Sequence, residues 1–125
     1  MNTFKLEEKS AIILGGLGGY SIAIAQLILK RGGRVLLADL KEPQEAKSIL
    51  SCQFEEAQES KRVIYVKCDV RSEKEIENAF KVAHKDLVSP DNSVDILING
   101  AGIVGEQQWE KLYDINIVSA ITVLF

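Results

Sequence analysis

The chain has 125 residues, the size of one small domain, and we expect residues 1–125 to form a single unit. Hydrophobic residues make up 46% of the chain and charged residues 26%, which excludes a disordered or a fibrous protein. The formal net charge is −3 with both signs interspersed, so no basic patch points to a nucleic-acid partner.

Cysteine and histidine are scarce in this chain. Cys52 and Cys68 have no paired spacing, and with His84 as the one histidine they cannot form a zinc site. Two lone thiols behind a polar N-terminus favour a reducing compartment. The first apolar run, 11–14, is too short for a signal peptide or a membrane span. We therefore expect a cytoplasmic protein that holds no metal ion and binds no membrane.

The first predicted strand is the apolar run 11–14, and a helical pattern follows over 20–31. Gly32 and Gly33 come directly after this helix, as glycine often does at a helix C-terminus. The residues that we expect on its buried face are Tyr20, Ile24, Leu27 and Ile28.

Between this strand and this helix lies a turn with four glycines in five positions, Gly15, Gly16, Gly18 and Gly19. Glycine lets the backbone turn tightly and lets another group approach it closely. The helix that follows presents free N–H groups and the positive end of its dipole, which favours an anion such as pyrophosphate. The order strand, turn, helix strengthens this interpretation. The alternative is a tight connection that binds no ligand.

The second predicted strand, 34–39, ends at an acidic residue, and a proline then begins a second helix, predicted over 43–57. Asp39 lies twenty residues after Gly19, where an acid accepts hydrogen bonds from the ribose hydroxyls of a bound dinucleotide. A carboxylate there repels a 2′-phosphate, which favours NAD over NADP, although the nearby Lys41 softens this exclusion. The alternative is that Asp39 caps the second helix.

The third predicted strand, 62–67, leads to Asp69 and Val70. Ligands of open parallel sheets bind beyond the carboxyl ends of the strands, so Asp69 is placed to meet an adenine amino group and Val70 to flank the ring. The alternative for Asp69 is the capping of a turn. Ser72 and Glu75 have the spacing of a capping box, which predicts that a third helix begins there.

The fourth predicted strand, 94–98, is followed by Asn99 and by the small residues Gly100, Ala101 and Gly102. Small side chains would let a flat ligand lie against the backbone at this strand end. The alternative, an ordinary turn after a strand, does not explain why these residues occur together.

A last helix is predicted from about Gln107 to the end of the chain. Asn116 is polar on its otherwise apolar stripe, and a buried amide without partners costs about 1–3 kcal/mol. Asn116 is therefore expected either to bond a backbone group of the fourth strand or to organise water or a catalytic side chain. The two roles are compatible.

Four strands alternate with four helices in this prediction. Continuous runs of Val, Ile and Leu indicate a parallel sheet that is covered on both faces, and right-handed crossovers leave few topologies. We therefore predict an α/β fold of the Rossmann type, a doubly wound parallel sheet of four strands in the order 3-2-1-4.

At these motifs the chain resembles the short-chain dehydrogenase/reductase family. The glycine turn is similar to that family's Thr-Gly-x-x-x-Gly-x-Gly pattern, in which Gly15 and Gly19 match the first two glycines. The segment 99–102, Asn-Gly-Ala-Gly, resembles the family's Asn-Asn-Ala-Gly, and Asp39 and Asp69 fall where the family binds NAD. The similarity extends along the chain and is strongest to the NAD-dependent 15-hydroxyprostaglandin dehydrogenases and the insect-type alcohol dehydrogenases.

This resemblance implies an enzyme that oxidises a secondary alcohol, hydroxyprostaglandin-like or another small lipophilic alcohol, with hydride transfer to NAD+. It implies that Asn116 is the asparagine of an Asn-Ser-Tyr-Lys catalytic tetrad. In the complete protein it also implies a homodimer through the last helix. The residues that it places at the cofactor are Gly15, Gly16, Gly18, Gly19, Tyr20, Asp39, Leu40, Asp69, Val70, Asn99, Gly100, Ala101 and Gly102.

The chain departs from the family pattern in three respects. Leu14 replaces the usual threonine and Ser21 replaces the third glycine, which weakens the fit of the turn. No tyrosine is followed by lysine four residues later, so the tetrad is incomplete. Because the family fold has further strands, we expect an incomplete sheet, truncated before the catalytic Tyr-x-x-x-Lys region, and a chain that is inactive alone. The alternative is a non-catalytic nucleotide-binding or regulatory module.

Overall fold

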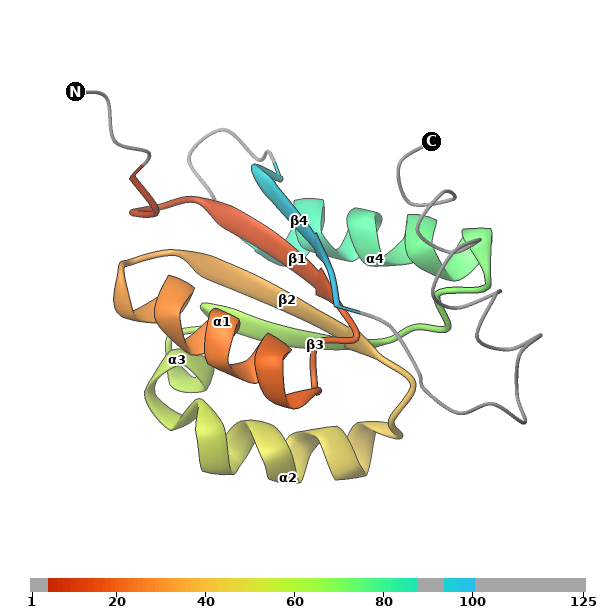
Figure 1. The fold of residues 1–125 in the computed structure, drawn as a ribbon, viewed down its shortest axis with the longest axis horizontal. Coiled ribbons are helices and arrows are strands. Elements are labelled where there is room, and N and C mark those ends of the chain that lie inside the picture. Colours follow the sequence, from red (N-terminus) through yellow and green to blue (C-terminus); the bar gives the residue numbers. More distant parts are fainter. Residues whose placement is uncertain (1–4, 88–93, 101–125) are drawn as a thin grey trace.

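The structure is a computed structural model, and it describes residues 5–87 and 94–100. Figure 1 shows a single sheet with helices packed against it. The strands are β1 (Ser10–Leu14), β2 (Arg34–Asp39), β3 (Val63–Lys67) and β4 (Ile96–Asn99). The helices are α1 (Gly19–Lys30), α2 (Pro43–Gln53), α3 (Glu55–Glu59) and α4 (Glu73–Asp86).

The strands form one parallel sheet in the order β3-β2-β1-β4, which confirms the predicted strand order and the α/β class. β1 lies inside the sheet, where Ile12 pairs with Leu36 of β2 on one side and with Leu97 of β4 on the other. All residues of β1 are buried. A continuous apolar strand is stable in this position because both faces of the sheet are covered.

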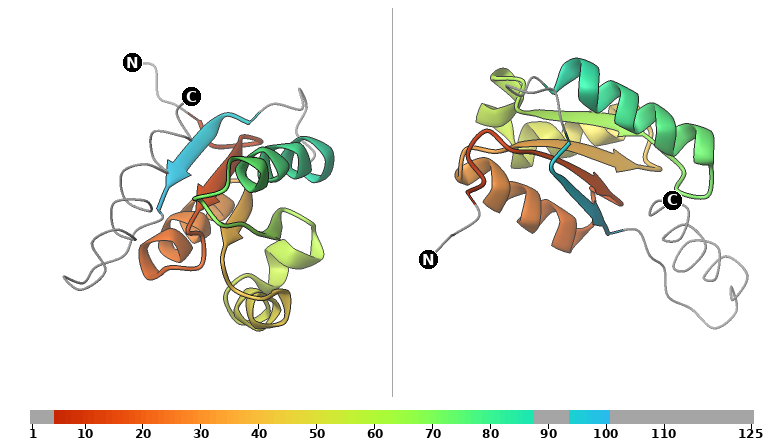
Figure 2. Two further views of the ribbon diagram at one scale, coloured as in Figure 1. Left: turned by 90° about the vertical axis from the view of Figure 1, so that its right-hand side faces the viewer. Right: turned by 90° about the horizontal axis from the view of Figure 1, so that it is seen from above.

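Helices lie on both faces of the sheet (Figures 1 and 2). Ile13 and Leu37 point into the core that contains buried residues of α1 and α2. Ile12 and Leu36 point the opposite way, into a second core that contains the buried residues of α4. Successive residues of a strand face opposite sides, so one apolar run supplies both cores.

The buried face of α1 differs from the predicted one. Tyr20, Ile24 and Leu27 are exposed, and Tyr20 retains 91% of its accessible surface. The residues of α1 that are buried are Ser21, Ala25, Ile28 and Leu29. Small side chains at the first two of these positions let the helix lie close to the sheet, and the larger apolar residues then face outward. Of the predicted face, only Ile28 is buried.

The helix predicted over 43–57 is interrupted at Phe54, which separates α2 from α3. Phe54 leaves the helical conformation with φ −137° and ψ 34°, and only 4% of its surface is exposed. Burying an aromatic ring in the core offsets the loss of helix continuity at this residue. The structure therefore has two short helices where the pattern predicted one.

α4 begins as the capping-box spacing predicted, although the box is only half formed. Ser72 Oγ accepts a hydrogen bond from the backbone N–H of Glu75 at 3.3 Å. The carboxylate of Glu75 accepts instead from the N–H of Asp69, at 3.2 Å. The buried residues of α4 are Ile76, Ala79 and Ala83.

The two cysteines have different surroundings, and we expect them to differ in reactivity. Cys52 is exposed, whereas Cys68 retains 1% of its surface. Burial, reinforced by the carboxylates of Glu75 and Asp69, raises the pKa of the Cys68 thiol to about 11. Only the thiolate reacts readily with a disulfide reagent, so at about pH 8 one thiol should react at once and the second only after unfolding. In Cys52→Ser the fast reaction should disappear, and its persistence would contradict the burial of Cys68.

Candidate functional site

The predicted site residues follow strands whose carboxyl ends lie along one edge of the sheet, because all four strands are parallel (Figure 1). The glycine turn follows β1, Asp39 ends β2, Asp69 comes after β3, and Gly100 comes directly after β4. Between β1 and β4 the strand order reverses direction, since β2 and β3 lie on the other side of β1. Open α/β sheets bind their ligands at this edge and at this switch point.

Two glycines of the turn are required by the chain itself. Gly15 has φ +68°, in the left-handed region that favours glycine. Gly16 lies against β2, where its N–H donates to the carbonyl oxygen of Ala38 at 3.0 Å. A Cβ on Gly16 would lie 2.8 Å from the Cβ of Leu37. These two glycines shape the turn whether or not a ligand binds.

The other two glycines have no such explanation among the described residues. A Cβ on Gly18 would meet only the carbonyl oxygen of Gly15, at an ordinary 3.5 Å, and a Cβ on Gly19 would meet nothing within 4 Å. Gly18 is the N-cap of α1, with no side-chain cap, and the first turn of α1 contains no acidic residue. The first N–H groups of the helix can therefore bind an anion at close range. Tyr20, which follows Gly19 in the first turn of α1, is exposed.

Asp39 joins the end of β2 to the glycine turn. Its Oδ2 accepts from the N–H of Leu17 at 3.1 Å, and its Oδ1 accepts from the N–H of Leu40 at 2.7 Å. The N-cap of α2 is Glu42, without a side-chain hydrogen bond, so the alternative that Asp39 caps this helix is wrong. Asp39 is half-buried and Leu40 is exposed, which leaves both accessible to a ligand at the sheet edge.

The carboxylate of Asp69 is bound within its own turn. It accepts from the guanidinium of Arg71 at 3.0 and 2.8 Å and from the backbone N–H of Arg71 at 2.9 Å. This is the turn-capping role that the sequence left open. Val70 retains 7% of its surface and packs in the core beside α4. Contacts of Asp69 and Val70 with adenine stay predictions, and Asp69 would make such a contact while paired with Arg71.

β4 ends against the glycine turn. The N–H of Gly100 donates to the carbonyl oxygen of Leu14 at 2.8 Å, and a Cβ on Gly100 would lie 2.5 Å from Oγ of Ser21. Gly100 is therefore the small residue that makes room for Ser21, and the exposed Asn99 precedes it. The predicted site residues Ala101, Gly102 and Asn116 lie outside the described residues, as does the last predicted helix.

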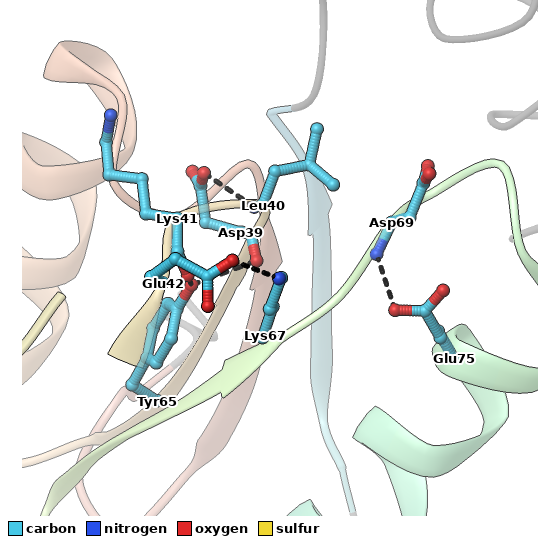
Figure 3. A network of polar contacts seen from close by, with 8 residues as sticks. All are labelled: Asp39, Leu40, Lys41, Glu42, Tyr65, Lys67, Asp69 and Glu75. Carbon is cyan, nitrogen blue, oxygen red and sulfur yellow. Dashed lines mark hydrogen bonds and ion pairs between the residues drawn. The ribbon is translucent and has the colours of Figure 1, made fainter. Parts of the chain in front are cut away.

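A tyrosine that the sequence pattern did not single out supports the end of β2. Tyr65 Oη donates to the carbonyl oxygen of Asp39 at 2.9 Å and also contacts the carbonyl oxygen of Lys41 (Figure 3). Burial, together with the carboxylates of Asp39 and Glu42, raises the pKa of Tyr65 to about 12, so its hydroxyl remains a donor at neutral pH. The available signal was a polar ring end in an apolar strand, which usually has a partner when buried.

Residues 5–87 and 94–100 contain neither a candidate metal site nor a candidate membrane-spanning helix. No group of three or more His, Cys, Asp or Glu side chains there could hold a metal ion. No helix within the same ranges is long and apolar enough to cross a membrane. The arrangement that the structure does show, an open helix N-terminus beside the Asp39 carboxylate, suits a ligand with both phosphate and hydroxyl groups.

The sequence matches known dehydrogenases over most of its length. A family model described as short chain dehydrogenase matches residues 9–124. The chain is 32% identical over 116 residues to 15-hydroxyprostaglandin dehydrogenase (NAD+) of Homo sapiens, covering 91% of this chain and 41% of that protein. It is 30% identical over 129 residues to xanthoxin dehydrogenase of Arabidopsis thaliana, covering 93% of this chain and 42% of that protein. The chain thus spans about two fifths of the length of these curated relatives.

The fold is also similar to solved structures. The crystal structure of a short-chain dehydrogenase/reductase, a glucose/ribitol dehydrogenase from Brucella melitensis, matches with a TM-score of 0.79 at 21% identity. The match covers 98% of this chain and 52% of that chain. At this level of identity the likeness concerns the fold, and it agrees with the parallel sheet described above.

Proposed function

Because the chain belongs to the short-chain dehydrogenase family, we propose that it is the NAD-binding portion of an enzyme that oxidises a secondary alcohol. The observation that supports a dinucleotide most directly is the pair Gly18 and Gly19. Both lack side chains at the uncapped N-terminus of α1, although no neighbouring atom in the described chain requires it. Pyrophosphate would lie there, bound by backbone N–H groups, above the turn shaped by Gly15 and Gly16.

NAD, and not NADP, is the cofactor that this site favours. The carboxylate of Asp39 would accept hydrogen bonds from the ribose hydroxyls, and its charge would repel a 2′-phosphate. The hydrogen bond from the N–H of Leu17, at 3.1 Å, holds this carboxylate beside the glycine turn. The name of the 15-hydroxyprostaglandin dehydrogenase (NAD+) relatives supports the same cofactor.

The remaining predicted contacts belong to the same proposal. Adenine would lie near the segments that follow β2 and β3, beside Leu40, Asp69 and Val70. The other end of the dinucleotide would pass the glycine turn and Tyr20 and lie against the small residues 99–102.

The chemistry of the reaction would require groups beyond this site. When bound, NAD+ supplies the acceptor for the hydride that leaves the alcohol carbon. A base must remove the hydroxyl proton, and these 125 residues contain no tyrosine that precedes a lysine by four positions. Asn116 would hold a water molecule for such a base. We propose a hydroxyprostaglandin-like or another small lipophilic alcohol as substrate of the complete enzyme, and binding without turnover for this chain alone.

The complete enzyme is further proposed to be a cytoplasmic homodimer that associates through the helix predicted from Gln107. Light scattering checks the oligomeric state of a longer protein that contains both this chain and a Tyr-x-x-x-Lys segment. A monomer at all concentrations would contradict the dimer.

Titration with NADH and NADPH, followed by energy transfer from Trp109 to the reduced nicotinamide, tests the cofactor site. We expect NADH to bind more tightly than NADPH. Asp39→Asn keeps an acceptor for the N–H of Leu17 but removes the charge, so the preference for NADH should fall about tenfold or more. Asp86→Asn is the matched control, because it removes an exposed carboxylate at the end of α4, away from the site.

Two results would contradict the proposal in different ways. If the ratio of the two dissociation constants is unchanged in Asp39→Asn, then Asp39 does not determine the preference for NADH. Steady NADH production from a secondary alcohol by the pure chain removes the claim that the chain alone is inactive.

A non-catalytic nucleotide-binding or regulatory module is a second candidate, because the catalytic pair is not found in these 125 residues. Both candidates predict NADH binding, so binding does not distinguish them. A coding sequence downstream of Phe125 that contains Tyr-x-x-x-Lys favours the enzyme. A stop codon there, with stable and soluble expression, favours the module.

A further inference from the structure

The turn after β2 is held by a side chain from the neighbouring strand. Tyr65 lies in the middle of β3, where it pairs with Leu37, and its ring packs against the core beneath α1 and α2. Its hydroxyl reaches the carbonyl oxygen of Asp39, at 2.9 Å, and that of Lys41 (Figure 3). One side chain thus connects both ends of the three-residue turn 39–41.

The other contacts of this turn constrain it less. The carbonyl oxygen of Asp39 also accepts from the N–H of Cys68 at 2.8 Å, which extends the sheet pairing but does not reach Lys41. Glu42 forms an ion pair with Lys67, but both side chains are exposed, and such pairs contribute little. α2 begins without a side-chain cap. The N–H groups of Leu17 and Leu40 hold the carboxylate of Asp39. The hydroxyl of Tyr65 adds the contact that ties the backbone of Asp39 to that of Lys41.

The same turn determines where two opposite charges lie. Figure 3 shows the carboxylate of Asp39 and the side chain of Lys41 extending to one side of the turn, and the ring of Tyr65 lying on the other. The direction of each side chain follows from the backbone that bears it. A change in the backbone over 39–41 would therefore move both the negative and the positive group at the proposed ribose position.

We propose that Tyr65 is a positioning residue for cofactor preference, an inference that rests on the proposed NAD-binding function. Its hydroxyl holds the turn so that Asp39 faces the ribose hydroxyls and Lys41 stays apart from the 2′ position. Without this hydroxyl the turn relaxes. The carboxylate of Asp39 then no longer faces the ribose hydroxyls, and the ammonium group of Lys41 can approach a 2′-phosphate.

Tyr65→Phe tests the proposal, because it keeps the ring in the core and removes only the hydroxyl. The dissociation constant for NADH should rise about two- to tenfold, the range that one hydrogen bond is worth, while that for NADPH stays constant or falls. The ratio of the two dissociation constants is the readout, since a general loss of protein stability would weaken the binding of NADH and NADPH alike. Ser60→Ala is the matched control: it removes a hydroxyl that donates to the carbonyl oxygen of Ala57 at 3.1 Å, ahead of β3, and should not change the ratio.

Two further variants distinguish this role from a general one. If Tyr65 acts through Asp39 as well as Lys41, then Tyr65→Phe should change the ratio less in an Asp39→Asn background than in the unchanged chain. Equal effects in both backgrounds would overturn the proposal. Lys67→Met removes the exposed ion pair with Glu42 and should change the ratio much less than Tyr65→Phe does. If the preference for NADH is the same with and without the hydroxyl, the role of Tyr65 is refuted but the proposed function is not. A folded chain that binds neither cofactor refutes the proposed function itself.

Discussion

Gly16→Ala should lower the free energy of unfolding by about 3 kcal/mol, because the added methyl group has no space. Its Cβ would lie 2.8 Å from the Cβ of Leu37, 3.0 Å from the Cα of the same residue and 2.9 Å from the carbonyl oxygen of Ile13. These atoms belong to β1 and β2, whose residues here are fully buried and paired. Neither strand can move away without breaking the sheet. Urea unfolding followed by circular dichroism measures the loss.

Gly19→Ala is the control, and it separates the structural glycines from the proposed functional ones. A Cβ on Gly19 would have no neighbour within 4 Å, and this residue begins α1, where alanine favours the helix more than glycine does. Stability should therefore be unchanged or slightly higher, while the affinity for NADH falls because the methyl group occupies the place proposed for pyrophosphate. A Gly16→Ala chain as stable as the unchanged one would contradict the close approach of the turn to β2. Unchanged NADH affinity in Gly19→Ala would remove the main support for the dinucleotide site.

The arrangement of the sheet was predictable because local patterns determine it. The predicted strand 34–39, for example, matches β2 at both ends, and short connections between strands and helices leave few topologies. The buried face of α1 was not predictable in the same way. Apolar residues occur on two overlapping stripes of this helix, and the stripe that contains Ser21 and Ala25 is buried because small side chains let the helix lie near the sheet. That distance is a property of the packed fold and has no local signal.

The candidate site shows the same division. The turn and the strand ends were predictable, because glycines and acidic residues mark them. The contacts that orient these groups were not, because they join side chains to distant backbone atoms. The carboxylate of Asp39 meets the N–H of Leu17, 22 residues away, and its carbonyl oxygen meets the hydroxyl of Tyr65, 26 residues away. A backbone N–H or carbonyl group belongs to almost every residue, so the sequence cannot indicate which one is used.

Gly100→Ala should lower the free energy of unfolding by about 2 kcal/mol, because two parts of the site already meet at this residue. The added Cβ would lie 2.5 Å from Oγ of Ser21 and 3.0 Å from the carbonyl oxygen of Leu14. Ser21 is 4% exposed, so its hydroxyl has little room to move aside. In α1, Ser21 stands where the family pattern has its third glycine. After β4, Gly100 stands where the family's Asn-Asn-Ala-Gly segment has its second asparagine. The two departures fit together, since the space needed by Ser21 is the space that Gly100 leaves.

Ser21→Gly allows this explanation to be tested by a double-mutant cycle. Alone it should cost about 0.5 kcal/mol, because glycine has a lower helix propensity than serine. In its presence Gly100→Ala should cost less, by about 1 kcal/mol, since only the carbonyl oxygen of Leu14 remains in the way. Denaturant unfolding of the four chains gives the coupling energy, and strictly additive losses would show that the two side chains do not compete for space. The Kd for NADH should show the same coupling between the two substitutions, because Gly100 lies beside the glycine turn. A Cβ added at Gly100 would lie 3.8 Å from the carbonyl oxygen of Gly15. A methyl group that pushes β4 away from α1 therefore also widens the place proposed for the dinucleotide, and removing the hydroxyl of Ser21 should restore both stability and affinity in part.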